Sequence, residues 1–292
     1  MAPTARWFGG ACVRIEPITF LNGIITMKNQ LRLGLTILLS TAMLACAGTP
    51  AVPADFSSAI AAAVADGARP AADTARDADR KPAELIAFAG IKPGDQVADL
   101  MPGGGYFTRI FSKLVGPQGH VYAVVPASIA AAKPAALDGI KALVADPAYR
   151  NTSLEVQPYD RIAADQSLDV AWTSQNYHDV YGAVSIFSVS GKSGAEEAAA
   201  LDAAVFKALK PGGVYIVIDH AAKAGAGGSV ANTLHRIEPA TVIEQVQAAG
   251  FVLEARSELL ANPQDGHEEA VFATEIKGHT DKFVLKFRKP RS

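Results

Sequence analysis

The sequence predicts an α/β fold, in which a mostly parallel sheet of seven strands is covered by helices on both faces. Short apolar segments of strand length alternate with segments of helical periodicity, and turns rich in glycine and proline separate them. One glycine turn joins a strand directly to a helix. The 292 residues are 49% hydrophobic and 19% charged, with a formal net charge of −2. This is the composition of an ordinary globular protein, and without a basic surplus we expect no nucleic acid among its partners.

The first 47 residues have the pattern of a secretory signal preceded by an extension. The basic leader Met27–Arg32 is followed by the apolar run Leu33–Leu44 and by small residues around Cys46. The run is too short to span a bilayer, and the three parts together are typical of a signal peptide. We therefore expect residues 1–26 to be an upstream extension, residues 27–47 to be the signal peptide, and the mature protein to lie in the periplasm or cell envelope of a bacterium.

Two processing routes at Cys46 remain open. Leu44-Ala45-Cys46-Ala47 resembles a bacterial lipobox, which would place a lipid on Cys46 and anchor the protein to the membrane. Ala45-Cys46-Ala47 also fits an A-x-A site with cleavage after Ala47. We expect no disulfide in the mature domain, because the only other cysteine of the sequence is Cys12.

Residues 48–80 are expected to form a linker and an N-terminal helical segment, and residues 81–292 the main domain. The stretch 48–56 is rich in Pro and Ala, which is typical of a tether, and the alanine-rich stretch 57–66 has helical composition. The predicted strands of the main domain are Gln96–Leu100, His120–Val125, Leu154–Gln157, Leu168–Thr173, Val214–Asp219, Phe251–Ser257 and Lys282–Lys289. The predicted helices start at Lys81 and Tyr106 and cover Pro134–Val144, Ala195–Leu209 and Pro239–Ala249.

The most informative segment is the glycine turn Gly103-Gly104-Gly105, which lies between the first strand and the helix that starts at Tyr106. Glycines allow positive φ and let backbone amides approach a ligand. The helix N-terminus behind them offers unpaired N–H groups and the positive end of a dipole, which suits an anionic group. The turn therefore predicts a site for a nucleotide-like cofactor.

Together with two later segments, this turn resembles the class I S-adenosylmethionine-dependent methyltransferases. Asp99 followed by Pro102–Gly105 is similar to the acidic-x-Gly-x-Gly-x-Gly turn of that family, Leu209–Gly213 precedes a fifth strand, and Ala248–Phe251 enters a sixth. The resemblance covers residues 80–290 and implies a Rossmann-like methyltransferase fold with a C-terminal antiparallel hairpin and S-adenosylmethionine as cofactor. Four segments are similar to a group of exported predicted methyltransferases: Arg80–Glu84, Pro102–Thr108, Asn176–Asp179 and Thr280–Phe283.

The resemblance also implies which residues contact the cofactor. Asp99 is expected either to approach the amino-acid part of the cofactor or to accept hydrogen bonds from the amides of its own turn. The other candidates lie on the glycine turn and at the ends of the second, third and fourth strands: Pro102, Gly103, Gly104, Gly105, Tyr106, Thr108, Val125, Pro126, Tyr159, Asp160 and Asn176. For Tyr159 and Asp160 the alternative is a solvent-exposed turn.

Three side chains at the carboxyl edge of the sheet, where such sheets bind ligands, are candidates for catalysis: His178, Tyr177 and His220. His178 is a candidate general base because the ordinary pKa of histidine, about 6.5, suits proton removal at neutral pH. Tyr177 is expected to line the acceptor pocket, and His220 and His235 to join His178 around it. The alternative for Asn176–Asp179 is a polar loop that caps the strand. The histidines lie on separate loops without i, i+4 spacing, so no metal site is predicted.

Two departures from the family pattern bear on the cofactor. Met101 stands where the family has its first glycine, and the second strand ends in Val125-Pro126 without a carboxylate to bind the ribose hydroxyls. Such a carboxylate contributes about 1.5–3 kcal/mol. The leading hypothesis is an S-adenosylmethionine-dependent methyltransferase acting on a small-molecule or lipid-like acceptor. The alternative is an exported non-catalytic protein of the same fold that binds a lipid, a metabolite or an envelope partner.

Overall fold

The computed structural model describes residues 54–158, 160–163, 165–181 and 194–291. The upstream extension, the signal peptide, Tyr159 and residues 182–193 lie outside the described residues. Within the described ranges, no helix combines the length and the apolar character that a membrane crossing requires.

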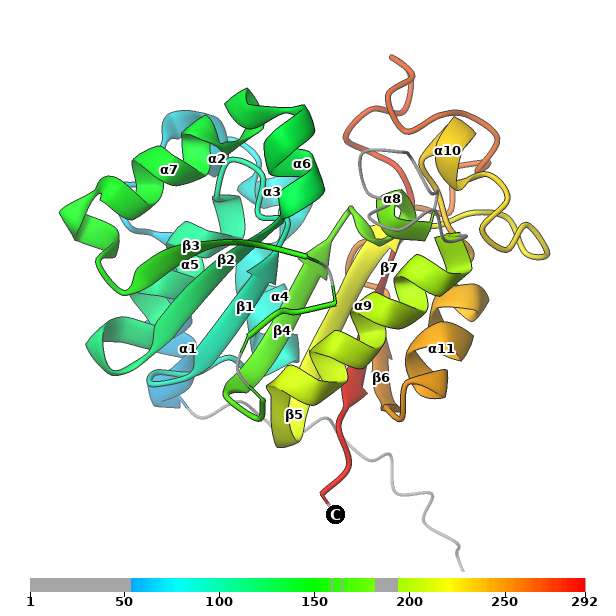
Figure 1. The fold of residues 1–292 in the computed structure, drawn as a ribbon. Coiled ribbons are helices and arrows are strands. Elements are labelled where there is room, and N and C mark those ends of the chain that lie inside the picture. The colour runs from blue at the N-terminus through cyan, green and yellow to red at the C-terminus, as the bar shows by residue number, and fades with distance from the viewer. Residues whose placement is uncertain (1–53, 159, 164, 182–193, 292) are drawn as a thin grey trace, which may run out of the picture. The chain divides into compact units, whose positions relative to one another are not determined.

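A seven-stranded sheet forms the centre of the unit made by residues 50–292 (Figure 1). In sequence order its strands are β1 (Gln96–Leu100), β2 (His120–Pro126), β3 (Thr152–Gln157), β4 (Leu168–Ser174), β5 (Leu209–His220), β6 (Val252–Ser257) and β7 (Lys282–Arg288). In space the order is β3-β2-β1-β4-β5-β7-β6; β1 to β5 pair in parallel, and β7 is antiparallel to both of its neighbours. The predicted fold, including the C-terminal antiparallel hairpin, is confirmed.

Helices cover both faces of the sheet, because successive residues of its buried strands point to opposite sides. Val97 packs with α1 (Ala54–Val64), α4 (Pro82–Ala89) and α5 (Tyr106–Val115), whereas Ala98 packs with α9 (Gly194–Ala208) and α11 (Pro239–Ala248). The shorter helices are α2 (Ala71–Thr74), α3 (Asp77–Arg80), α6 (Ala127–Ala132), α7 (Asp138–Ala145), α8 (Tyr177–Tyr181) and α10 (Ala231–Leu234), and three 3-10 turns cover Gly116–Gln118, Pro134–Leu137 and Pro147–Tyr149.

The N-terminal helical segment is helical as predicted, but it belongs to the same packed unit as the main domain. Ile60 and Ala63 of α1 are buried in one core with Ile110 and Phe111 of α5 and with Trp172 of β4. Residue 81 therefore does not separate two bodies, and residues 71–80 are held close to the glycine turn.

Two short helices were not predicted, and one predicted turn belongs to a strand. Residues 177–181 form α8, so the polar loop that was the alternative for Asn176–Asp179 is not found. Residues 127–132 form α6. Lys210–Gly213 belong to β5, which begins at Leu209 with a register irregularity opposite Leu168 and Val170. A run containing Pro and two Gly gives no strand signal by composition, and its place next to β4 is a tertiary effect.

Candidate functional site

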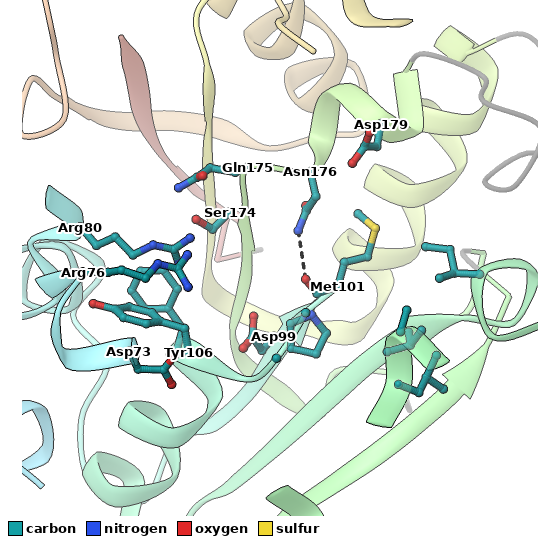
Figure 2. Close-up of a pocket in the computed structure, with 18 residues that line it drawn as sticks. Asp73, Arg76, Arg80, Asp99, Met101, Tyr106, Ser174, Gln175, Asn176 and Asp179 are labelled. Carbon is teal, nitrogen blue, oxygen red and sulfur yellow. Dashed lines mark hydrogen bonds between the residues drawn. The ribbon is translucent and has the colours of Figure 1, made fainter. Parts of the chain in front are cut away.

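A cavity of about 390 Å³ opens at the carboxyl ends of β1 and β4, beside the glycine turn (Figure 2). This volume lies within the range of about 300–1,000 Å³ that is usual for small-molecule sites. The cavity is lined by these predicted cofactor-binding residues: Asp99, Pro102, Gly103, Gly104, Tyr106, Val125 and Asn176. Gly105, Thr108, Pro126 and Asp160 are not among the residues that line it.

The three glycines of the turn have different roles. Gly103 and Gly104 are exposed, and a Cβ added at either would meet no atom within 4 Å, so the backbone is open to a ligand there. Gly105 is buried at φ 86, and its added Cβ would lie 2.5 Å from Cδ1 of Leu143 on α7. Glycine is thus required at position 105 by the backbone conformation and by packing against Leu143. The expectation that Gly105 contacts the cofactor is therefore wrong.

Asp99 is 3% exposed and lines the cavity floor. Burial raises the pKa of its carboxyl group to about 7, although the hydroxyl of Thr108 donates a hydrogen bond of 2.6 Å that acts in the opposite direction. Thr108 is itself fully buried, so it orients Asp99 and does not touch a ligand, which corrects its expected role. A carboxyl group that changes charge near neutral pH is thereby placed in the cavity.

Asn176 fastens the glycine turn to β4. Its Nδ2 donates to the carbonyl oxygens of Leu100 (3.1 Å) and Met101 (3.3 Å; Figure 2), while its Oδ1 accepts a hydrogen bond from the hydroxyl of Thr173. Met101 has φ 53, a left-handed conformation that costs an L-residue about 1–2 kcal/mol. The departure from glycine seen in the sequence therefore has a conformational consequence, and Asn176 helps to hold the strained turn.

Residues 69–80 build one wall of the cavity, which the sequence prediction missed. Arg76 and Arg80 place their guanidinium carbons 5.4 and 4.6 Å from the ring centre of Tyr106, on the side of the cavity away from Asp179 (Figure 2). The hydroxyl of Tyr106 donates to Asp77 at 2.6 Å, and Asp77 pairs with Arg69 at 2.7 Å. This network fixes the ring on which the two arginines lie.

The two guanidinium groups are the notable electrostatic feature of the cavity. Burial, followed by the charge of Arg76, lowers the pKa of Arg80 to about 10. Over the part of the chain that the structure describes, no carboxylate lies within ion-pair distance of either group, because Asp73 pairs with Arg109 (3.1 Å) and Asp77 with Arg69. A site with two adjacent cations of this kind is suited to an anionic group. The alternating charges of residues 73–80 were the available sequence signal.

The opposite part of the cavity is apolar. Val125 at the end of β2 lines it together with Ile129, Ala136 and Leu137. Pro126 is buried and does not line the cavity, and Asp160 is exposed outside it. The expectation that these two residues contact the cofactor is therefore wrong. Tyr159 lies outside the described residues. The carboxylate-free end of β2 leaves this region without an acidic partner for a ribose.

Solved structures share this architecture. The [4+2]-cyclase SpnF is similar with a TM-score of 0.54 and 16% identity, covering 74% of this chain and 82% of that chain. The complex of the Haloferax volcanii Trm112 methyltransferase activator with a candidate methyltransferase gives a TM-score of 0.50 and 16% identity, covering 82% and 100%. An S-adenosylmethionine-dependent methyltransferase from Aquifex aeolicus gives 0.49 and 15%, covering 70% and 88%. The chain has the class I methyltransferase fold.

No protein-family model and no curated protein matches this chain. At identities of this size the likeness establishes the methyltransferase fold alone.

Tyr177 does not line an acceptor pocket in this methyltransferase fold. Its side chain is fully buried, and its hydroxyl donates to Oδ2 of Asp202 at 2.7 Å. Burial and the charge of Asp202 raise the pKa of Tyr177 well above its ordinary value. The expected catalytic role is wrong, because α8 turns this side chain into the core.

His178 is 3% exposed and is held by Asp219 at the end of β5. Its Nδ1 lies 2.8 Å from Oδ1 of Asp219, and its backbone N–H donates to the other carboxylate oxygen at 2.7 Å. Burial would lower the pKa of His178, but the carboxylates of Asp219 and Asp179 together raise it above the ordinary value. His178 does not itself line the cavity; its neighbour Asp179 does, with Nε2 of His178 and Oδ1 of Asp179 3.4 Å apart.

The three histidine rings lie close together as expected, but only His220 lines one of the two cavities. The ring centre of His178 lies 5.3 Å from that of His235 and 5.9 Å from that of His220. His220 contacts the hydroxyl of Thr280 at 2.7 Å, and burial lowers its pKa to about 3. A histidine with so low a pKa is neutral at pH 7 and a weak proton acceptor, which argues against His220 as general base.

His220 lines a second cavity, of about 420 Å³, which adjoins the first. The two cavities share Arg76, Arg80, Phe107, Ser174 and Gln175 in their linings. The site thus consists of two neighbouring compartments separated by the arginine wall and by the residues that follow β4.

Proposed function

We propose that the protein is an S-adenosylmethionine-dependent methyltransferase that acts on a small-molecule or lipid-like acceptor. The observation that supports this most directly is the pair of guanidinium groups of Arg76 and Arg80 beside the open glycine turn of a methyltransferase fold. The amino-acid carboxylate of the cofactor suits these cations, and its adenine ring suits the apolar part around Val125 and Leu137. The ribose hydroxyls find no carboxylate on β2, which predicts weak binding.

The bound cofactor would supply an electrophilic methyl group on its sulfonium. The protein's part is then to position the cofactor and to exclude water. In this proposal Arg80 binds the carboxylate, Asn176 keeps the turn in place, and the ionised form of Asp99 complements the positive charges of the cofactor. His178 with Asp179 is the candidate base, because Asp179 reaches the cavity and His178 is oriented by Asp219.

The second cavity is the proposed acceptor site. Its lining carries four cationic side chains (Arg76, Arg80, Lys277 and Lys282) against one acidic side chain, Asp79. Leu85, Leu260, Val271 and Phe272 provide apolar surface in the same cavity. An acceptor with an apolar body and an anionic group fits this combination, which favours a lipid-like molecule.

A non-catalytic role is the second candidate, favoured by the strained Met101 and the carboxylate-free end of β2. The cyclase SpnF also indicates that proteins of this fold can carry a different named activity. On this reading the protein binds a lipid, a metabolite or an envelope partner, and it keeps that partner when the cofactor cavity is filled by a side chain.

Equilibrium binding of labelled S-adenosylmethionine to the purified full chain tests the proposal. We expect saturable binding that S-adenosylhomocysteine displaces, since the two molecules share the carboxylate and the adenosine. The absence of saturable binding at millimolar concentration removes the methyltransferase proposal and leaves the binding protein.

We also propose export of the mature protein, either anchored by a lipid on Cys46 or released by cleavage after Ala47. Incorporation of labelled palmitate, lost in Cys46→Ser, tests the anchor. Cleavage after Ala47 without label supports the soluble exported form instead. We further propose that residues 1–26 are an upstream extension and that translation begins at Met27, which a peptide from residues 1–26 in protein from the native host would contradict.

A further inference from the structure

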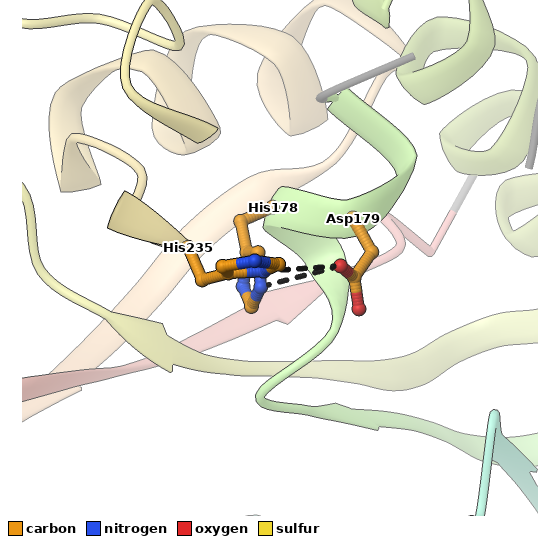
Figure 3. A group of neighbouring side chains, drawn as sticks. All are labelled: His178, Asp179 and His235. Atoms are coloured by element: carbon orange, nitrogen blue, oxygen red, sulfur yellow. Dashed lines mark ion pairs between the residues drawn. The ribbon is translucent and has the colours of Figure 1, made fainter. Parts of the chain in front are cut away.

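The fold brings together two histidines and an aspartate, although the histidines lie on separate segments of the sequence and gave no prediction of a metal site. His178 and Asp179 lie on α8, whereas His235 follows α10, more than fifty positions later in the sequence. One ligand atom from each side chain lies within 4.8 Å of the other two (Figure 3). Both imidazole rings are directed at the same carboxylate of Asp179 (Figure 3).

Two of the three separations agree with those around a tetrahedral metal ion. Nε2 of His178 is 3.4 Å from Oδ1 of Asp179, and Nδ1 of His235 is 3.6 Å from the same oxygen. Nitrogen and oxygen ligands about 2.0–2.2 Å from a zinc ion in tetrahedral geometry lie about 3.3–3.6 Å apart. His235 is partly exposed, and its ligand nitrogen lies within 4.8 Å of that of His178, so the two nitrogens must come closer when a metal ion binds.

Asp219 gives His178 the orientation that a metal ligand requires. It is fully buried and accepts hydrogen bonds from the backbone N–H groups of His178 and His220, both at 2.7 Å, besides facing Nδ1 of His178 at 2.8 Å. Nδ1 therefore carries the proton toward Asp219, and in the neutral ring the lone pair of Nε2 points toward Asp179. A carboxylate that receives the second N–H of a histidine is the usual companion of a histidine ligand.

The position of His235 adds an independent observation. It ends α10 in the left-handed conformation (φ 56) in which many helices terminate. Its ring packs against Phe272 with ring centres 4.8 Å apart, and Phe272 lines the second cavity while Asp179 lines the first. The three side chains thus meet where the two compartments adjoin.

We propose that His178, Asp179 and His235 bind a divalent first-row transition metal ion, with zinc as the reference ion, between the cofactor and acceptor compartments. Three protein ligands of this kind leave at least one coordination position for water or for an oxygen of a bound molecule. A metal ion there would occupy Nε2 of His178 and so replace the His178–Asp179 base proposed above. An oxygen bound to the metal becomes more acidic without that base, so the site would take an acceptor that presents a hydroxyl or carboxylate oxygen. Metal binding itself does not depend on the proposed methyl transfer, because it is measured without cofactor.

Calorimetric titration of zinc chloride into the chelator-treated full chain, purified without a histidine tag, tests this site. We expect the unmodified chain to bind one more equivalent of zinc than the Asp179→Asn variant or the His235→Asn variant. Asn preserves the shape of the aspartate, and at position 235 it tolerates positive φ. His279→Asn removes an exposed histidine elsewhere and is the matched control. This variant should bind as much zinc as the unmodified chain. Zinc bound by Cys12 or Cys46 is common to all four proteins and cancels in the comparison.

Cobalt(II) provides the second measurement. We expect the visible bands of tetrahedral cobalt in the unmodified chain and in His279→Asn, and their loss in both site variants. Thermal unfolding of the metal-free proteins identifies any variant that fails to fold. If one site variant does not fold, the zinc binding of the other site variant tests the proposal. Equal zinc stoichiometry in all four proteins, or no zinc binding below millimolar concentration in the unmodified chain, overturns the proposal.

Discussion

Replacing Arg80 by Gln tests the proposed orientation of the cofactor. In the described part of the chain, the Arg80 guanidinium lies over the ring of Tyr106 at 4.6 Å with no carboxylate at ion-pair distance, so its charge is available to a ligand. A hydrogen bond to a charged group contributes about 1.5–3 kcal/mol, and each 1.4 kcal/mol is a factor of ten. We therefore expect the Kd for S-adenosylhomocysteine to rise about 10- to 150-fold in Arg80→Gln.

The assay compares two ligands by calorimetry. S-Adenosylhomocysteine carries the amino-acid carboxylate, whereas 5′-methylthioadenosine keeps the adenosine and lacks that carboxylate. Only the first should bind more weakly to the variant. We expect little change in stability, because the lost repulsion between Arg80 and Arg76 offsets the lost contact of Arg80 with the Tyr106 ring. Arg150→Gln, at an exposed arginine, is the matched control and should bind both ligands as the unmodified chain does.

Equal weakening of both ligands would refute this orientation, since it would mean that Arg80 supports the cavity as a whole. Unchanged affinity for S-adenosylhomocysteine would refute it as well, because the carboxylate would then be bound elsewhere.

Three further predictions concern the cavity and the core. Gly104→Leu should abolish S-adenosylhomocysteine binding with an unchanged Tm, because its Cβ meets open space in the cavity lining; a fall in Tm would mean that position 104 is needed for folding. Burial raises the pKa of Asp99 to about 7, so calorimetry should show affinity for S-adenosylmethionine rising from pH 6 to 7.5 as the carboxylate forms, and Asp99→Asn should remove this rise. Burial raises the pKa of Asp202 from 3.8 to about 7, so its contribution to stability is complete below pH 3.8 and is lost as the pH rises through 7. Asp202→Asn, which keeps an acceptor for Tyr177, should therefore increase the free energy of unfolding more at pH 8 than at pH 4, with an upper limit of about 4 kcal/mol (three pKa units at about 1.36 kcal/mol each) in urea titrations.

The sheet could be predicted from the sequence because its signals are local. Each buried strand is a short apolar run bounded by turn residues, and the helix after the glycine turn repeats its apolar residues at helical spacing, so α5 and β1 were predicted almost to the residue. The helix α8 was missed, because five residues with a histidine and an aspartate carry no periodic signal. What makes it a helix is tertiary: Tyr177 reaches Asp202 and the backbone of His178 binds Asp219.

The sequence predicted the site residues that lie on one continuous segment, and it missed those that tertiary packing brings to the cavity. Asp99, Gly103 and Gly104 lie on one continuous segment that the sequence identifies. Arg80 reaches the cavity only because α1 to α4 fold back onto α5 and fix Tyr106, and no local pattern indicates that approach. The sequence also did not show which residues of the turn and of α5 face the cavity. Gly105 and Thr108 lie on these segments, yet both are buried in the interior.

The structure of the protein bound to S-adenosylhomocysteine tests the central claim most directly. We expect the ligand in the cavity beside Gly103 and Gly104, with its carboxylate at Arg80 and its adenine against Val125. A ligand bound elsewhere, or bound with its adenine against the arginines, would contradict it.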